Sequence, residues 1–143
     1  MKFVPHDYQR YCVEYIKSHS VSALFLDMGL GKTAVTLTAL RDLMFDELAV
    51  SKVLVIAPLR VARDTWPSEI RKWDHLQEIE ISVITGTVKQ RTAAINSNAF
   101  IYVVNRENVK WLVEYYEKNG LRWDYDMIVI DEDYVKGFPT PTL

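Results

Sequence analysis

The stretch over residues 22–35, SALFLDMGLGKTAV, constrains the fold more than any other part of the chain. Its apolar run over residues 23–26 predicts a buried strand, and a turn with two glycines leads from that strand into a helix that opens at Lys32. Gly29 and Gly31 carry no Cβ, so the backbone of the turn can adopt positive φ and approach a ligand closely. Successive N–H groups of the turn and the helix N-terminus then face one concavity, which indicates a phosphate site.

The next two residues complete this site. Lys32 is placed to reach the β- and γ-phosphates of a nucleotide as a point charge, and the Thr33 hydroxyl to hold Mg²⁺. The full phosphate-loop pattern G-x-x-x-x-G-K-[ST] has a glycine where this chain has Leu26, so what remains is the shorter G-x-G-K-T. Its context, an apolar strand before and a helix after, favours a nucleotide-phosphate site over a strand–turn–helix corner with a chance Lys-Thr pair.

The length and the charge of the chain narrow the class of protein. With 143 residues there is room for one domain with an ordinary core, and a formal net charge of −2 supplies no basic field. Any contact with nucleic acid must therefore come from local groups. Cys12 is the only cysteine, which argues against a disulfide framework and fits a reducing compartment. No run approaches the roughly 18 apolar residues of a membrane span. The expectation is a cytoplasmic protein without a membrane partner.

Apolar runs alternate with amphipathic stretches along the chain. Helices are predicted over residues 7–18, 32–48, 89–95 and 106–118, with another from about residue 67; strands are predicted over 23–26, 53–57, 79–84, 100–104 and 127–130. Residues 58–66 form a turn or short helix, because Pro67 suits the start of a helix rather than its interior. The alternation predicts an α/β domain with a mostly parallel sheet over residues 1–132. Residues 133–143, with Gly137, Pro139 and Pro141, read as an irregular tail.

Two carboxylates follow the last predicted strand. Asp131 and Glu132 emerge at its C-terminal end, along the edge where open α/β sheets bind their ligands. Transfer of a phosphoryl group to water needs an acid that holds Mg²⁺ and a second group that orients the water. Asp131 fits the first role and Glu132 the second, although a helix cap or surface pair is the alternative for such a dipeptide.

Taken together, these stretches resemble the N-terminal motor domain of superfamily 2 helicases. More narrowly, the chain is similar to the Swi/Snf-type helicase-like ATPases of phages and prophages. The resemblance extends from about Pro5 to Glu132. It is carried by DYQ at residues 7–9 (Q motif), DMGLGKT at 27–33 (motif I), APLR at 57–60 (motif Ia), TG at 85–86 (motif Ib), VNRE at 104–107 and DE at 131–132 (motif II).

The resemblance implies a RecA-like phosphate-loop fold that uses ATP and Mg²⁺ and has double- or single-stranded DNA as a partner. It implies that Gln9 reads the adenine edge. The implied nucleotide-binding set is Gln9, Gly29, Leu30, Gly31, Lys32, Thr33 and Ala34; the catalytic set is Lys32, Asp131 and Glu132; the metal set is Thr33 and Asp131. Its DNA-facing positions fall on Arg60, Thr85, Gly86, Asn105 and Arg106, with a surface arginine as the alternative for the two arginines. Two alternatives remain for the tryptophans, which could stack on bases or lie in the core: Trp66, Trp73, Trp111 and Trp123.

Two departures from the family pattern bear on activity. Asp133-Tyr134 follows motif II where many relatives have Ala-His, and no motif III strand or second lobe with an arginine finger follows in these 143 residues. In this fold class the motif III strand lies between the phosphate-loop strand and the motif II strand. Without it, unpaired edges would border a gap. We therefore expect a rearranged sheet, or pairing with a second copy of the chain as a homo-oligomer.

The main interpretation is the ATP-binding lobe of a DNA-dependent, helicase-like translocase that turns over ATP weakly or not at all by itself. One alternative is a truncated remnant that binds nucleotide or self-associates without turnover. A small nucleotide kinase is a third, but it would need a lid of arginines near the C-terminus, and Lys136 is the one basic residue after Glu132.

Overall fold

The computed structural model describes residues 22–27, 32–46 and 50–132 of the chain. These residues build one five-stranded sheet in the order β1-β5-β2-β4-β3, and every pair of neighbours is parallel. The strands are β1 (Ser22–Asp27), β2 (Val53–Ala57), β3 (Ile81–Ile84), β4 (Ile101–Asn105) and β5 (Met127–Glu132). The predicted α/β fold with a parallel sheet is confirmed. The helix predicted over residues 7–18, Gln9 and the glycine turn lie outside the described residues.

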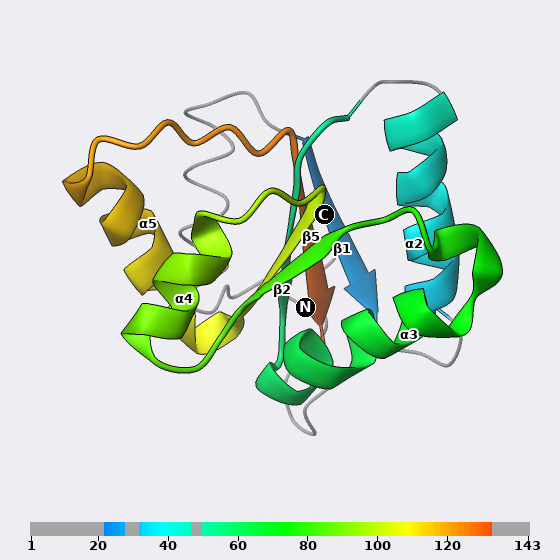
Figure 1. Ribbon diagram of the computed structural model, residues 1–143, viewed down its shortest axis with the longest axis horizontal. Coiled ribbons are helices and arrows are strands. Elements are labelled where there is room, and N and C mark those ends of the chain that lie inside the picture. Colours follow the sequence, from blue (N-terminus) through cyan, green and yellow to red (C-terminus); the bar gives the residue numbers. More distant parts are fainter. Residues whose placement is uncertain (1–21, 28–31, 47–49, 133–143) are drawn as a thin grey trace, which may run out of the picture.

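Helices cover both faces of the sheet. Figure 1 shows α2 (Lys32–Arg41) and α3 (Trp66–Lys72) on one side, and α4 (Val88–Ile95) and α5 (Val109–Lys118) on the other. The side chains of β2 and β4 are buried along their whole length, as expected when a continuous apolar run is covered on both faces. This explains why these two strands read as uninterrupted apolar runs rather than as alternating ones.

Each face of the sheet has its own hydrophobic core. Between the sheet and α2–α3, the core includes Leu37, Val55, Ala62, Trp66, Val103 and Val129. Between the sheet and α4–α5, it includes Leu54, Ile56, Leu112, Tyr116, Tyr125, Ile128 and Ile130. Alternate residues of one strand enter opposite cores because successive side chains of a strand point to opposite faces. Among the described residues, no helix has the length and apolar content needed to cross a membrane.

The strand that leads to the glycine turn pairs directly with the strand that carries the two carboxylates. β1 and β5 are in register over six positions, from Ser22↔Met127 to Asp27↔Glu132. The gap considered above is therefore absent between these strands, and the sheet is rearranged relative to the order that the resemblance implied. Both strands are six residues long, so their backbones can pair along their full length without an intervening strand.

Several predicted boundaries shift. The helix predicted over residues 32–48 is α2 followed by a π-helical turn, η1 (Asp42–Asp46). Before Pro67, a second π-helical turn, η2 (Val61–Thr65), runs straight into α3, and the backbone at Thr65 and Trp66 is helical. Pro67 has no N–H to donate, and the hydrogen bonding changes from π to α one residue before it. The 3₁₀ turns η3 (Asp74–Leu76) and η4 (Arg106–Asn108) precede β3 and α5.

Candidate functional site

The predicted site residues of three strands lie at one level along the carboxyl edge of the sheet. The register aligns one apolar row across all five strands, which consists of Phe25, Ile130, Ile56, Val104 and Ile84. The residues that directly follow this row on β5, β4 and β3 are Asp131, Asn105 and Thr85. The arrowheads at the lower side of Figure 1 mark this edge. The parallel sheet thus brings together three polar positions that are far apart in the sequence.

Asp131 is the most buried of these polar groups. Its exposed fraction is 3%, and its Oδ2 accepts a hydrogen bond of 2.9 Å from the indole Nε1 of Trp66. Trp66 itself is fully buried in the core under α2 and α3. A buried carboxylate requires a donor, and here α3 supplies it. For Glu132 the structure describes the backbone, which pairs with Asp27 at the end of β1.

The start of α2 belongs to the same edge of the sheet. Lys32 is the first residue of this helix, and the side chains of Thr33 and Ala34 in its first turn are half-buried. β1, which precedes α2, is the direct neighbour of β5. The pairing of β1 with β5 therefore fixes the start of α2 at Lys32 relative to the end of β5 at Asp131-Glu132. Gly29, Leu30 and Gly31 of the turn between β1 and α2 lie outside the described residues.

A groove opens beside these groups, over the carboxyl ends of β2, β3 and β4. Its volume is about 550 Å³, and it is lined by Leu59, Arg63, Val83, Thr85, Gly86, Gln90, Asn105 and Asn108. We call it the polar groove. It unites three of the predicted DNA-facing residues, Thr85, Gly86 and Asn105. Arg60 is exposed next to the groove residue Leu59, and Arg106 is half-buried next to Asn105, but neither arginine lines the groove.

One wall of the polar groove depends on a glycine. Gly86 has φ 88°, and a Cβ there would collide with the side-chain oxygen of Gln90. That oxygen accepts a hydrogen bond of 2.9 Å from the backbone N–H of Thr87, and the Thr87 hydroxyl accepts one of 3.2 Å from the Gln90 N–H. This reciprocal cap starts α4. The predicted motif Ib glycine is thus required by the backbone and by its contact with the cap.

The other wall is fixed by a chain of side-chain hydrogen bonds. Asn105 Oδ1 accepts from Asn108 Nδ2 at 2.7 Å, and Asn108 Oδ1 accepts from Arg91 at 2.6 Å. The Arg91 guanidinium lies over the Trp111 ring, 4.3 Å from its centroid. Sequence reasoning missed Asn108, Gln90 and Arg63, although each lies within five residues of a predicted DNA-facing position.

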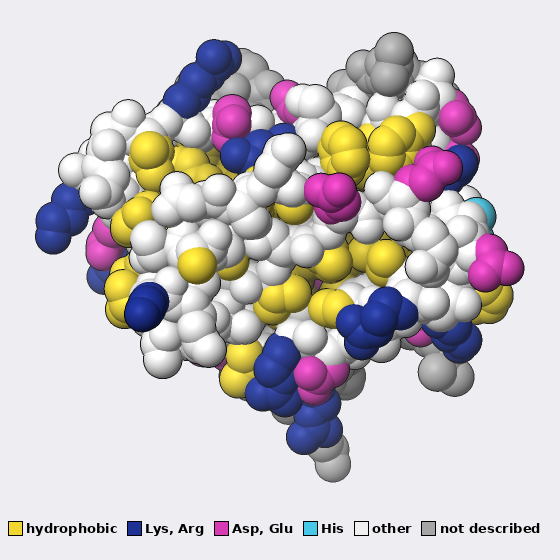
Figure 2. Space-filling view, viewed as in Figure 1, with side chains coloured by type: hydrophobic (Ala, Val, Ile, Leu, Met, Phe, Trp, Pro, Cys, Tyr) yellow, Lys and Arg dark blue, Asp and Glu magenta, His cyan; other side chains and the backbone are white. Residues whose placement is uncertain are grey.

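Arg63 brings positive charge to the rim of the groove. It forms a bidentate pair with the neighbouring Asp64, with distances of 3.0 and 3.1 Å. This hydrogen-bonded pair lowers the pKa of Asp64 and raises that of Arg63. Figure 2 shows Lys and Arg side chains gathered along the lower rim of the molecule, over η2 and α3, with acidic side chains among them. The exposed basic residues of these segments are Arg63, Arg71 and Lys72, and the exposed Arg60 directly precedes η2.

The four tryptophans have different environments. Trp66 is a core residue, whereas Trp73 is 40% exposed and donates to Glu69 Oε2 at 2.8 Å. Trp111 and Trp123 are half-buried; Trp111 stacks on Tyr115, and Trp123 packs edge-on against Tyr116 and Tyr125. No tryptophan lines the polar groove. Base stacking in this groove by a tryptophan is therefore not supported by the arrangement.

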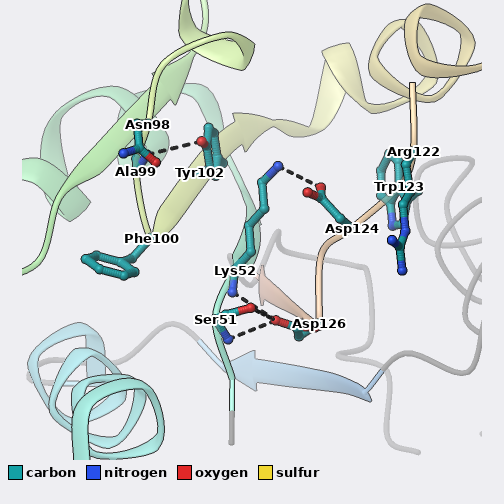
Figure 3. A pocket seen from close by; sticks show the side chains of 10 residues that line it. All are labelled: Ser51, Lys52, Asn98, Ala99, Phe100, Tyr102, Arg122, Trp123, Asp124 and Asp126. Carbon is teal, nitrogen blue, oxygen red and sulfur yellow. Dashed lines mark hydrogen bonds and ion pairs between the residues drawn. The ribbon is translucent and has the colours of Figure 1, made fainter. Parts of the chain in front are cut away.

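A second cavity of about 620 Å³ lies at the opposite, amino edge of the sheet (Figure 3). There Lys52 Nζ bonds Asp124 Oδ1 at 2.7 Å and lies 4.9 and 4.8 Å from the ring centroids of Tyr102 and Tyr125. Asp126 Oδ2 accepts from the Ser51 N–H, the Ser51 hydroxyl and the Lys52 N–H, at 2.8, 2.6 and 3.0 Å. Burial alone would raise the pKa of Asp126, but these hydrogen bonds lower it.

The fold and site define an α/β domain in which a Lys-Thr pair opens the helix after β1 and an Asp-Glu pair ends β5, the parallel neighbour of β1. The family model of the SNF2-related domain matches residues 8–135, and the chain belongs to this family. It is also similar to "Putative protein p41" of Acyrthosiphon pisum secondary endosymbiont phage 1, with 41% identity over 131 residues, which are 91% of this chain. The chain spans 28% of the length of that relative. The Swi/Snf-type, phage-like resemblance and the RecA-like fold class are confirmed, and the family indicates a helicase-like ATPase motor domain.

Proposed function

We propose that residues 1–132 form the N-terminal, ATP-binding lobe of a DNA-dependent, helicase-like translocase. The observation that carries this proposal is the position of Asp131. It is a buried carboxylate at the carboxyl end of β5, and β5 is hydrogen-bonded to the strand that leads into the Lys32 helix. An ATPase of this class needs its phosphate-binding lysine and its metal-binding carboxylate at one sheet edge, and the direct pairing of β1 with β5 supports that arrangement.

Each residue of the nucleotide site has one task in this proposal. Lys32 and the backbone of residues 29–34 bind the phosphates, and Gln9 recognises the adenine. Thr33 and Asp131 would hold Mg²⁺, since a hydroxyl and a carboxylate are the oxygen ligands that this ion prefers. When bound, the ion neutralises charge on the β- and γ-phosphates. Glu132 orients the attacking water and accepts its proton.

The polar groove is the part of this lobe that we assign to the DNA backbone. Thr85 and Gly86 offer a hydroxyl and an exposed backbone to phosphate oxygens, which is how proteins position a strand without reading its sequence. The Asn105 amide lies beside them, is 6% exposed and donates to Glu107 Oε2 at 2.9 Å. The exposed Arg60 and the half-buried Arg106 add positive charge around the groove, while the charge of Arg63 is offset by its pair with Asp64. This assignment is supported by the lining of the polar groove, which includes three of the five predicted DNA-facing residues.

The proposal is tested by calorimetric titration of the 143-residue chain with ATP in Mg²⁺, beside Lys32→Ala. We expect binding by the natural chain and loss of it in the variant, with the same thermal unfolding midpoint for both. Turnover by these residues alone is expected to be slow or absent, because an arginine finger from a second lobe contributes roughly 10³–10⁵ in rate. Equal affinity of both proteins, or no binding by either, would contradict a phosphate site at Lys32.

A second candidate is nucleotide binding and self-association without turnover. It is favoured by the sheet edge at β1, which has β5 as its one neighbour among the described strands. An edge strand of six residues can pair with another chain. Sedimentation equilibrium distinguishes the two: a concentration-dependent dimer that persists with ATP favours self-association, and a monomer at all concentrations favours the single lobe.

A further inference from the structure

We infer that Trp66 is a positioning residue for Asp131, the carboxylate proposed to hold Mg²⁺. Its indole N–H fixes the orientation of that carboxylate. The inference rests on the proposed function, because it assigns a task to the residue behind Asp131 rather than to the site itself. It adds α3, a helix outside the phosphate-loop and carboxylate motifs, to the machinery that sets the affinity for Mg²⁺.

The contact is specific in its chemistry. Trp66 Nε1 and Asp131 Oδ2 are 2.9 Å apart, and both residues are buried, with exposed fractions of 0 and 3%. An indole nitrogen can donate but cannot accept, so Asp131 Oδ2 is the acceptor of this bond. A donor behind a ligating carboxylate also fixes which way its oxygens point.

The indole is held rigidly enough to do this. Trp66 is part of the core that joins α2 and α3 to the sheet, together with Leu37, Val55 and Val129. A large ring in a close-packed core cannot turn without displacing its neighbours. Asp131 is therefore oriented by a group that is itself fixed, which is the condition under which a supporting residue improves a site.

The same helical backbone reaches the polar groove. Residues 61–72 are helical without a break, Arg63 lines the groove, and Trp66 follows it by three residues. The segment that holds the carboxylate thus also contributes Arg63 to the rim of the proposed DNA site. α3 offers a matched contact as well: Trp73 donates to Glu69 at 2.8 Å, but on the exposed surface of the molecule. This second indole–carboxylate pair is the natural control.

The experiment compares the affinity for ATP in saturating Mg²⁺ and in EDTA for the natural chain, Trp66→Phe and Trp73→Phe. Phenylalanine keeps an aromatic ring and removes the N–H. We expect Trp66→Phe to reduce the Mg²⁺-dependent gain in affinity by about 10–100-fold, which is the usual effect of removing a partner behind a metal ligand. Its affinity in EDTA should stay unchanged. Trp73→Phe should behave as the natural chain in both conditions.

Unchanged Mg²⁺ dependence in Trp66→Phe would overturn the inference and leave the proposed function intact. A natural chain that binds no ATP in either condition would overturn the proposed function, and the inference with it. An equal loss in Mg²⁺ and in EDTA would show a merely structural role and would also overturn the inference.

A measurement on the natural chain covers the case in which Trp66→Phe fails to fold. The chain has four tryptophans, so its ¹⁵N-labelled form gives four indole N–H signals, and phenylalanine at residue 73, 111 or 123 assigns three of them. Addition of Mg²⁺ to the ATP complex should shift the remaining signal, that of Trp66, and leave the Trp73 signal in place. A Trp66 signal that does not respond would overturn the inference.

Discussion

The two edges of the sheet use similar polar residues in opposite ways. At the amino edge, the polar side chains bond to one another: Ser51 to Asp126, and Lys52 to Asp124. These bonds connect the beginning of β2 to the segment that leads into β5. At the carboxyl edge, Asp131 is oriented by Trp66 from behind, and Asn105 by Asn108 from the side. Both edges border a hollow. At the amino edge the acidic groups accept from Lys52 and Ser51, which stabilises the fold, whereas Asp131 accepts from an uncharged indole that fixes its orientation. Substitutions at the amino edge should therefore affect mainly the stability of the fold, and substitutions at the carboxyl edge should also affect ligand binding.

The largest effect on stability is expected from Tyr125→Ala at the amino edge. Tyr125 is 1% exposed, and its hydroxyl lies 2.8 Å from that of Tyr116. Loss of a buried aromatic ring should lower the free energy of unfolding by about 3–5 kcal/mol, measured by urea denaturation. Tyr125→Phe removes only the hydroxyl and should cost about 1 kcal/mol. A folded Tyr125→Ala protein with weakened MgATP binding would break the comparison.

A smaller loss is expected from Gly86→Ala at the carboxyl edge. The change places a Cβ at φ 88° and against Gln90, so that the cap of α4 has to open. The backbone strain and the lost cap together should cost about 2–3 kcal/mol. Gly120→Ala is the control, since its φ of 62° is also positive but no atom lies within 4 Å of the added Cβ. Equal losses of stability in both variants would show that the contact with Gln90 does not contribute to the effect of Gly86→Ala.

The pH dependence of stability should report on Asp126. Its pKa is lowered in the folded state, so its contribution is fully present above the ordinary aspartate value of about 4 and is lost as the pH falls below it. Asp126→Asn should reduce the unfolding free energy at pH 7 by about 1 kcal/mol and flatten its decline toward pH 3. Urea titrations at both pH values measure this. A variant with the same acid sensitivity as the natural chain would assign that sensitivity to other carboxylates.

The smallest effect is expected from Arg60→Ala, and it should appear in binding alone. Arg60 is exposed next to the polar groove. Its removal should leave the unfolding midpoint unchanged and lower the slope of log affinity for DNA against log salt by about 1. Fluorescence anisotropy with a labelled duplex and a labelled single strand measures this slope. The exposed Arg122, at the amino-edge cavity, provides the control; a similar change in Arg122→Ala would mean that the two edges do not differ in DNA contact.

Much of the carboxyl edge was predictable from the sequence, because its signals are local. An apolar run that ends in Asp131-Glu132 and a helix that opens with Lys32-Thr33 each carry their chemistry within a few residues. The bond from Trp66 to Asp131 was not predictable in the same way, since it joins residues 65 positions apart. The same holds for Asp126 with Ser51, and for the direct pairing of β1 with β5. Such contacts depend on strand order, and hydrophobic periodicity contains no information about strand order.

The pairing of β1 with β5 also determines the distance between the two halves of the proposed nucleotide site. Neighbouring strands of a sheet are separated by about 4.8 Å, a spacing that backbone hydrogen bonds impose whatever the side chains. The chain leaves β1 at Asp27 toward Lys32, and β5 presents Asp131 one strand away. The sideways offset between these two halves of the site is therefore the shortest that a parallel sheet permits. Substitutions of side chains can change what the two halves hold, but only a different strand order can move them apart.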